Sequence, residues 1–134
     1  MTDIEGIHHV ALTVADVGVS VRWYIDVLGL VELFREESDE RRACVMRSAA
    51  GGFSIGVVEH RGGPERPFDP TRQGLDHLAF TVASREDLDA WVERLDAAGV
   101  AHSGVIDVPP GAILNFKDPD GIALALFWDR PESA

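Results

Sequence analysis

Residues 9–14 read His-Val-Ala-Leu-Thr-Val, and residues 77–82 read His-Leu-Ala-Phe-Thr-Val. The two histidines lie 68 positions apart (77 − 9), which is close to half of the 134 residues. A repeat at this spacing indicates that one supersecondary unit occurs twice in the chain. The repeated stretch therefore predicts two similar modules in tandem.

A helix is expected after each copy of the repeat. Asp16 precedes a first helical segment that stops at Gly29, and Ser84 with Asp87 begins a second one that stops at Gly99. Aspartate and serine are preferred at helix N-caps, and glycine is common just after a helix.

Three strand-like runs follow each predicted helix. They are Leu30–Glu37, Arg42–Arg47 and Phe53–Glu59 in the first half, and Val100–Val105, Ala112–Phe116 and Ile122–Trp128 in the second. This order predicts an α+β fold of two tandem βαβββ modules, residues 1–59 and 75–134. A linker rich in proline and glycine joins them over residues 60–74, and residues 130–134 are expected to fray.

Composition narrows the range of functions. The chain is 46% hydrophobic and 26% charged, which supplies enough apolar material for a folded core. A net charge of −11 repels nucleic acid and anionic lipid, and the single cysteine, Cys44, forms no internal disulfide. No apolar stretch reaches the ~20 residues of a membrane span, and the start lacks the features of a secretion signal. We therefore expect a cytoplasmic protein that acts on a small molecule or on a protein partner, with no nucleic-acid or membrane partner.

Strand alternation sorts the side chains of each repeat into two faces. One face is uniformly apolar and is expected to contact the helix of its own module. The other face carries His9 or His77 with small and partly polar neighbours, as expected for the lining of a cleft. The predicted ligand-binding residues on this second face are Ala11, Thr13, Ser54, Gly56, Val58, Ala79, Thr81, Ala125 and Phe127.

Four stretches together carry a resemblance to a known family: residues 9–16, 23–30, 77–82 and 116–124. With these motifs the chain resembles the vicinal oxygen chelate superfamily, which includes glyoxalase, bleomycin-resistance and extradiol-dioxygenase relatives. The resemblance implies paired modules whose curled mixed sheets enclose a cleft, usually within a homodimer.

The resemblance also implies candidate metal ligands. Enzymes of the superfamily hold a divalent metal (Fe, Mn, Ni or Zn) through one residue from each of four strands, and two of these positions match His9 and His77. The other two are usually glutamates, but this chain has Gly56 and Ala125 at the matching places. Two imidazoles alone leave the charge of the metal uncompensated, so we expect no complete metal site and no bound cofactor.

Neighbouring residues are not expected to replace the missing glutamates. Glu59 lies three residues from Gly56, so strand alternation turns it to the other face. His60 has the right parity but lies roughly 13 Å along the strand, as a rim residue. His8 and His102 have no counterpart in the other half and are expected to face solvent.

Three functions remain open. The first is a metal-free protein that binds a small organic molecule in the cleft, like the bleomycin-resistance branch. The second is a metal-dependent lyase, isomerase or dioxygenase in which His9 and His77 hold the metal with non-standard further ligands. The third is a cofactor-free enzyme with His9 or His77 as general base. The sequence favours the first, because small residues in place of two glutamates enlarge the cleft and remove buried negative charge.

A homodimer is also expected from the size of the modules. Each module has only about half of the 134 residues, which is too few to bury a core well alone. Strands such as residues 53–58 present edges that need cover. We expect an interface that is mostly apolar and low in charge.

Overall fold

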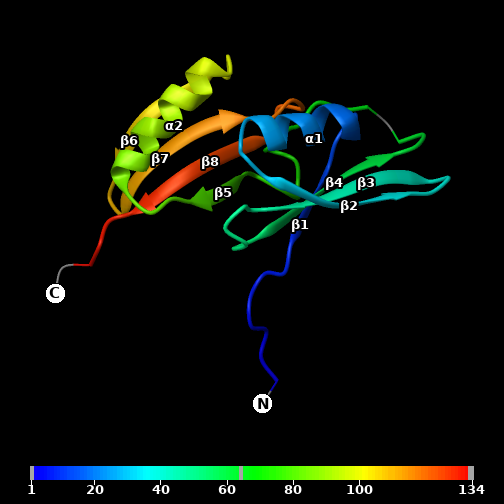
Figure 1. Cartoon of the computed structure of the whole chain (residues 1–134), viewed down its shortest axis with the longest axis horizontal. Coiled ribbons are helices and arrows are strands. Elements are labelled where there is room, and N and C mark those ends of the chain that lie inside the picture. Colours follow the sequence, from blue (N-terminus) through cyan, green and yellow to red (C-terminus); the bar gives the residue numbers. More distant parts are fainter. Residues whose placement is uncertain (1, 64, 133–134) are drawn as a thin grey trace. The chain divides into compact units, whose positions relative to one another are not determined.

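The computed structural model describes residues 2–63 and 65–132, and the chain divides into two compact units, residues 1–66 and 67–134. The predicted linker (60–74) contains Pro64, and the predicted frayed tail (130–134) contains Ser133 and Ala134. These three residues lie outside the described residues. Each unit has one helix and one sheet of four strands (Figure 1).

Unit 1 is the first βαβββ module. Its elements are β1 (Val10–Thr13), α1 (Val17–Asp26), β2 (Val31–Glu37), β3 (Arg41–Arg47) and β4 (Ser54–His60). The strand order is β1-β4-β3-β2, with β1 parallel to β4 and the other pairs antiparallel. Helix α1 covers one face of this sheet (Figure 1) and leaves the other face free of any helix of unit 1.

Unit 2 repeats this topology. Its elements are β5 (Leu78–Thr81), α2 (Arg85–Ala97), β6 (His102–Val108), β7 (Gly111–Lys117) and β8 (Ala123–Asp129). The order is β5-β8-β7-β6, with β5 parallel to β8. The predicted α+β class and the tandem βαβββ order are therefore confirmed.

Both helices begin at the predicted caps. Asp16 accepts a hydrogen bond from the backbone N–H of Val19 at 3.1 Å. Ser84 and Asp87 form a full capping box, in which each side chain accepts a bond from the backbone of the other residue. These short-range bonds satisfy backbone donors that a helix leaves open at its start, which explains why local sequence located them.

The face of each sheet under its helix forms a core. In unit 1 it contains Leu12, Val57 and Cys44, and α1 contributes Tyr24; these residues are at most 4% exposed. In unit 2 it contains Leu114 and Leu124, and α2 contributes the buried residues Leu88 and Leu95. The alternation predicted for the first strand of each module is present: in β1 Leu12 is buried while Ala11 and Thr13 are exposed, and in β5 the apolar residues are half-buried while the alternate residues are exposed.

The region around β6 differs from the sequence prediction. The strand covers His102–Val108 instead of Val100–Val105, and its pairing with β7 shifts register between His102 and Val105. Gly104 lies in this irregularity with φ of 72°, a conformation that side chains with a Cβ rarely adopt. A bulge that lengthens the strand is not visible in hydrophobic alternation.

A close backbone approach selects glycine at the start of β7. A Cβ on Gly111 would lie 1.8 Å from the carbonyl oxygen of Trp128 on β8. Position 111 therefore accepts no side chain without movement of the two strands.

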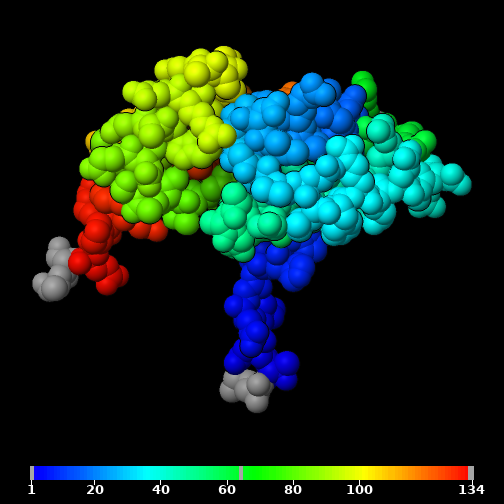
Figure 2. All heavy atoms as spheres, in the orientation of Figure 1, coloured from blue at the N-terminus to red at the C-terminus, as the bar shows by residue number. Residues whose placement is uncertain are grey.

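The segment before β1 stands clear of the body of unit 1 (Figure 2). Ile4 and Ile7 in this segment are 95% and 86% exposed. Within residues 2–63 and 65–132, no helix has the length and apolar character needed to cross a bilayer.

Candidate functional site

The predicted site residues of unit 1 lie on the face opposite α1. The parallel register sets Ala11 beside Gly56 and Thr13 beside Val58. Ala11 and Thr13 are exposed, Ser54 and Val58 are half-buried, and Gly56 is buried. We call this surface the open face of unit 1.

His9 lies immediately before β1 and is exposed. Its Nδ1 is 2.8 Å from Nδ1 of His8, so one ring donates and the other accepts. The two rings meet edge to face, with centroids 5.1 Å apart. Within the described part of the chain, the hydrogen-bond partner of His9 is therefore another imidazole and not a carboxylate.

The predicted site residues of unit 2 occupy the matching open face of the second sheet. Here the register sets Ala79 beside Ala125 and Thr81 beside Phe127. Ala125 is only 1% exposed, whereas Ala79 and Thr81 are exposed and Phe127 is half-buried. The hydroxyl of Thr81 donates to the carbonyl of Phe127 at 3.4 Å.

The donor atoms of a complete family-type metal site are missing. Gly56 and Ala125, at the two strand positions expected for carboxylates, carry no donor atoms in their side chains. Glu59 faces α1 instead, where its Oε1 accepts the backbone N–H of Val17 at 3.0 Å. Among the described residues, no group of three or more His, Cys, Asp and Glu side chains is arranged to hold a metal. The residues present do not fit the metal of the superfamily.

Backbone crowding does not explain the glycine at position 56. A Cβ there would lie 3.6 Å from the Cβ of Ala11, which is an ordinary van der Waals contact. The missing carboxylate is thus a property of the side-chain choice and not of the space available.

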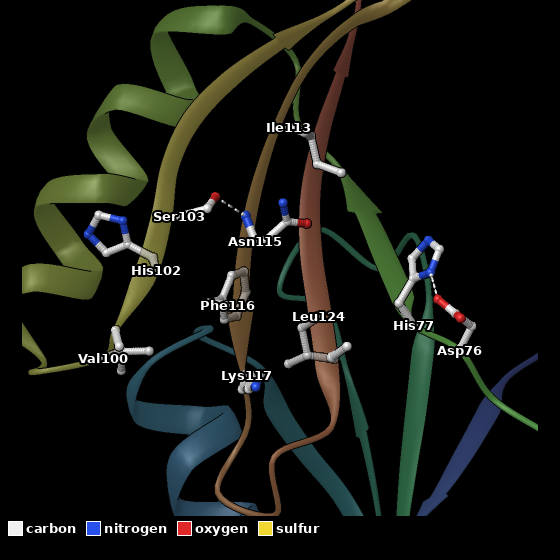
Figure 3. A pocket seen from close by; sticks show the side chains of 12 residues that line it. Asp76, His77, Val100, His102, Ser103, Ile113, Asn115, Phe116, Lys117 and Leu124 are labelled. Atoms are coloured by element: carbon white, nitrogen blue, oxygen red, sulfur yellow. Dashed lines mark hydrogen bonds and ion pairs between the residues drawn. The ribbon is translucent and has the colours of Figure 1, made fainter. Parts of the chain in front are cut away.

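His77 differs from His9 in its partner. Its Nδ1 lies 2.7 Å from Oδ1 of Asp76, and the two side chains are 57% and 74% exposed. A neutral imidazole that donates from Nδ1 keeps its Nε2 as an acceptor. The pair therefore presents an oriented imidazole whose second nitrogen is turned away from Asp76 (Figure 3).

A pocket of about 680 Å³ lies on unit 2 and includes this histidine (Figure 3). Its volume falls within the ~300–1,000 Å³ typical of small-molecule sites. The residues that line it are Asp76, His77, Val100, Ala101, His102, Ser103, Ile113, Asn115, Phe116, Lys117, Ala123 and Leu124. Of the predicted site residues, His77 lines this pocket, whereas Ala79, Thr81, Ala125 and Phe127 do not.

Alternation along β7 brings three of these side chains to the open face. Ile113, Asn115 and Lys117 alternate with Leu114 and Phe116, which are buried toward α2. Asn115 and Lys117 are not among the residues predicted from the sequence, all of which lie on or beside the first and last strands of each module. The same alternation rule applied to β7 would have found them.

Two other polar groups near the pocket are occupied by structural bonds. His102, which was expected to face solvent, is only 14% exposed in its side chain, so that prediction is wrong. Its Nε2 lies 2.6 Å from Asp96, and its Nδ1 accepts the backbone N–H of Gly104 at 3.0 Å. Ser103 accepts from the backbone of Asn115 at 3.0 Å and donates to the carbonyl of Gly104 at 2.7 Å.

The thiol of Cys44, the single cysteine of the sequence, is not a candidate nucleophile. Cys44 is fully buried beneath α1, and burial raises its pKa to about 11, with a smaller contribution from the hydrogen bond to Glu32. The thiol is therefore protonated at neutral pH, and its nucleophilic thiolate form is absent there.

Comparisons with known proteins agree on one family. The family model for the glyoxalase/bleomycin resistance protein/dioxygenase superfamily matches residues 6–126. The uncharacterized protein YaeR of Escherichia coli (strain K12) is 34% identical over 133 residues, which cover 95% of this chain and 98% of YaeR. The metallothiol transferase FosB of Staphylococcus saprophyticus is 28% identical over 120 residues, which cover 88% of this chain and 73% of FosB.

A solved structure has the same fold at higher identity. A glyoxylase/bleomycin resistance protein/dioxygenase domain from Frankia sp. EAN1pec is 43% identical and matches with a TM-score of 0.89. The match covers 96% of this chain and 100% of the Frankia chain.

Proposed function

Because the chain belongs to the glyoxalase/bleomycin resistance protein/dioxygenase superfamily, we propose that it binds a small organic molecule without the complete metal site of that superfamily. The observation that carries the proposal is the pocket of about 680 Å³ on the open face of unit 2. We assign the binding site to this pocket.

The lining of the pocket supports a partly apolar ligand. Val100, Ala101, Ile113 and Ala123 contribute apolar walls, and Asn115, Lys117 and His77 contribute polar groups. Sites for small organic molecules combine a mostly apolar lining with a few polar groups that fix orientation.

The superfamily alternative is a metal-dependent lyase, isomerase or dioxygenase that uses His9 and His77 with non-standard ligands. The relative FosB is named a metallothiol transferase. In this chain, however, the side chains at positions 56 and 125 are not carboxylates. Elemental analysis of the purified protein separates the two functions. We expect Fe, Mn, Ni and Zn well below one equivalent per chain. One equivalent that is lost in both His9→Ala and His77→Ala would establish the alternative and overturn our proposal.

A second candidate function, proton transfer by His77, is favoured by one contact. The bond to Asp76 at 2.7 Å orients the imidazole and leaves Nε2 as the proton acceptor. Asp76→Asn removes the charge but keeps the size of this partner. If the protein turns over its ligand, Asp76→Asn is expected to lower kcat with little change in ligand affinity. Equal turnover in Asp76→Asn would exclude a catalytic role for the pair.

Ligand binding is tested by thermal unfolding of metal-stripped protein with a panel of aromatic and apolar metabolites. A ligand at a hundredfold excess over its Kd is expected to raise Tm by about 5 °C or more. Ala123→Leu fills the pocket and is expected to abolish the shift. Ala90→Leu adds the same volume on the exposed side of α2 and is expected to retain it. A shift that survives Ala123→Leu would place the ligand outside this pocket.

We further propose that the protein acts as a homodimer. Edge strand β2 supports this, because all seven of its residues are exposed, including Leu33 at 46% and Phe34 at 56%. A long exposed edge with apolar side chains favours association. Sedimentation equilibrium at micromolar concentration is expected to give twice the chain mass of 14.6 kDa. A single species at the chain mass would contradict it.

A further inference from the structure

The polar groups of the unit 2 pocket are not equally available to a ligand. The side chain of Ser103 already forms hydrogen bonds with backbone groups of β6 and β7, and that of His102 with Asp96 and the backbone N–H of Gly104. The Nδ1 of His77 is held by Asp76. Two donors remain that form no hydrogen bond or ion pair to any described residue through their side chains: Lys117 and Asn115.

Lys117 is the only lysine among the 134 residues. It ends β7, opposite Ala123 of β8, and its side chain lies on the open face. No ion pair joins Lys117 to the neighbouring Asp118, whose Oδ1 accepts the backbone N–H groups of Asp120 and Ile122 at 2.9 and 3.0 Å. Asp118 is 6% exposed and serves the turn before β8. Among the residues that the structure describes, no carboxylate forms an ion pair with the ammonium group of Lys117.

Asn115 lies two residues earlier on the same strand and the same face. Figure 3 shows its amide and His77 on the two sides of β8. Its backbone N–H is used by Ser103, but its side-chain amide is not. An ammonium and an amide N–H₂ on one strand face offer several N–H donors and one positive charge to a ligand in the pocket.

We propose that this pocket recognises a small organic molecule that carries one carboxylate, held by Lys117 Nζ and the side-chain amide of Asn115. The inference rests on the proposed function and names the ligand class for it. The apolar walls at Val100, Ala101 and Ile113 hold the body of the molecule.

The charge around the pocket selects a monoanion. Asp76 lines the same pocket with an exposed carboxylate, and the whole chain carries a net charge of −11. A dianion such as phosphate meets stronger repulsion from these charges than a carboxylate does. One lysine at short range outweighs distant charges, which are screened beyond about 8 Å at physiological salt.

Unit 1 lacks an equivalent pair of donors. The register position of Lys117 is occupied there by Arg47, opposite Ser54, and that of Asn115 by Val45, opposite Gly56. Arg47 donates to the carbonyl of Ser48 at 3.3 Å. The open face of unit 1 thus has Arg47, which already donates a hydrogen bond, and the apolar Val45 in place of Lys117 and Asn115.

The single lysine makes a direct test possible. Reductive ¹³C-methylation labels Lys117 and the N-terminal amine, keeps their positive charge, and gives one side-chain resonance in the NMR spectrum. Benzoate is the probe, and benzamide is its neutral match in size and shape. We expect benzoate to shift the Lys117 resonance in a saturable manner and benzamide to leave it unchanged at the same concentration.

Variants assign the donors by ¹⁵N-NMR titration of metal-stripped protein with benzoate. Lys117→Gln is expected to raise Kd about tenfold, and Asn115→Leu by a few fold. Lys117→Arg keeps the charge and is expected to retain most of the affinity. Arg22→Gln removes one positive charge from the exposed surface of α1 and is expected to leave the affinity unchanged.

The outcomes separate the inference from the proposed function. If benzamide or another neutral molecule perturbs the amides of Ile113 and Ala123 while no carboxylate moves Lys117, the pocket binds organic molecules and the carboxylate inference is wrong. Inorganic phosphate that shifts Lys117 as strongly as benzoate would also overturn the choice of a monocarboxylate. If no organic molecule perturbs the pocket, both proposals fail.

Discussion

Unit 1 and unit 2 share one topology and one strand register, yet matched positions carry different chemistry. Val10 and Ile55 pair in unit 1 as Leu78 and Leu124 pair in unit 2. On the open face, however, unit 1 has a histidine bonded to a histidine, while unit 2 has a histidine bonded to a carboxylate. The two copies share one backbone arrangement and differ in their side chains, and the proposed binding pocket lies on unit 2.

The difference extends to the middle strands. Arg41 and Gly111 both begin the strand that pairs with the last strand of their unit. Under the helix, Cys44 of β3 matches Leu114 of β7, opposite Val57 and Leu126. A substitution at a position of one unit can therefore be compared with a substitution at the matched position of the other unit.

The largest expected effect is at the start of these middle strands. Gly111→Ala introduces a Cβ that meets the carbonyl oxygen of Trp128 at 1.8 Å, so the strands must separate. We expect a loss of about 3 kcal/mol in the free energy of unfolding, measured with urea. Arg41→Ala removes only exposed bonds to Glu36 and is expected to cost less than about 1 kcal/mol. Equal losses in the two variants would contradict the close approach in unit 2.

The next effect concerns the thiol in the core of unit 1. Burial raises the pKa of Cys44 from 9.0 to about 11. Below pH 9 the thiol is protonated in both folded and unfolded chains. Between pH 9 and 11 only the unfolded chain loses this proton, so stability falls with rising pH, by roughly 2 kcal/mol at pH 11.

Cys44→Val removes the titrating group and keeps an apolar side chain, so it serves as the control. The difference in unfolding free energy between the parent and Cys44→Val is expected to change with pH above 9 and to stay constant below it. A constant difference up to pH 11 would show that the thiol is not buried as described.

The matched cations give a smaller effect on binding. Lys117→Gln is expected to weaken benzoate binding about tenfold, equivalent to about 1.4 kcal/mol. Arg47→Gln at the matched position of unit 1 is expected to change it less than twofold, because Arg47 lies outside the pocket. Titration by NMR compares the two. A larger loss of benzoate affinity in Arg47→Gln than in Lys117→Gln would mean that the carboxylate binds to unit 1.

The helix caps give the smallest effect. Ser84→Ala is expected to cost about 1 kcal/mol in the free energy of unfolding. Asp16→Ala is expected to cost about half as much, because Glu59 still holds the first N–H of α1. Thermal unfolding of the two variants shows which cap contributes more to the free energy of unfolding. The reverse order would mean that Glu59 contributes little to the start of α1.

The features that sequence predicted are those with local causes. The caps at Asp16 and Ser84 depend on residues within three positions, and the repeat predicted the topology. The resemblance predicted that the two missing carboxylates belong at positions 56 and 125, and the structure places both positions on the open faces.

The features that sequence missed depend on contacts between strands. The shift in β6 is held by bonds from Ser103 to Asn115 and from Gly104 to His102, which hydrophobic alternation does not encode. Asp76 was missed because it precedes the strand, and only the structure shows its hydrogen bond to His77 and its place in the pocket lining. Alternation along β7 places Lys117 on the open face, but only the structure shows that it lines a pocket and forms no ion pair with any described residue.

The most direct test of the account is to compare backbone amides of the two open faces in metal-stripped protein. Binding of a small organic molecule is predicted to shift the ¹⁵N-NMR signals of Ile113, Asn115 and Ala123 in unit 2. The matched residues Ala43, Val45 and Ser54 in unit 1 are predicted to stay in place. Shifts confined to unit 1, or shifts in unit 2 that appear only after a divalent metal is added, would contradict metal-free binding in the unit 2 pocket.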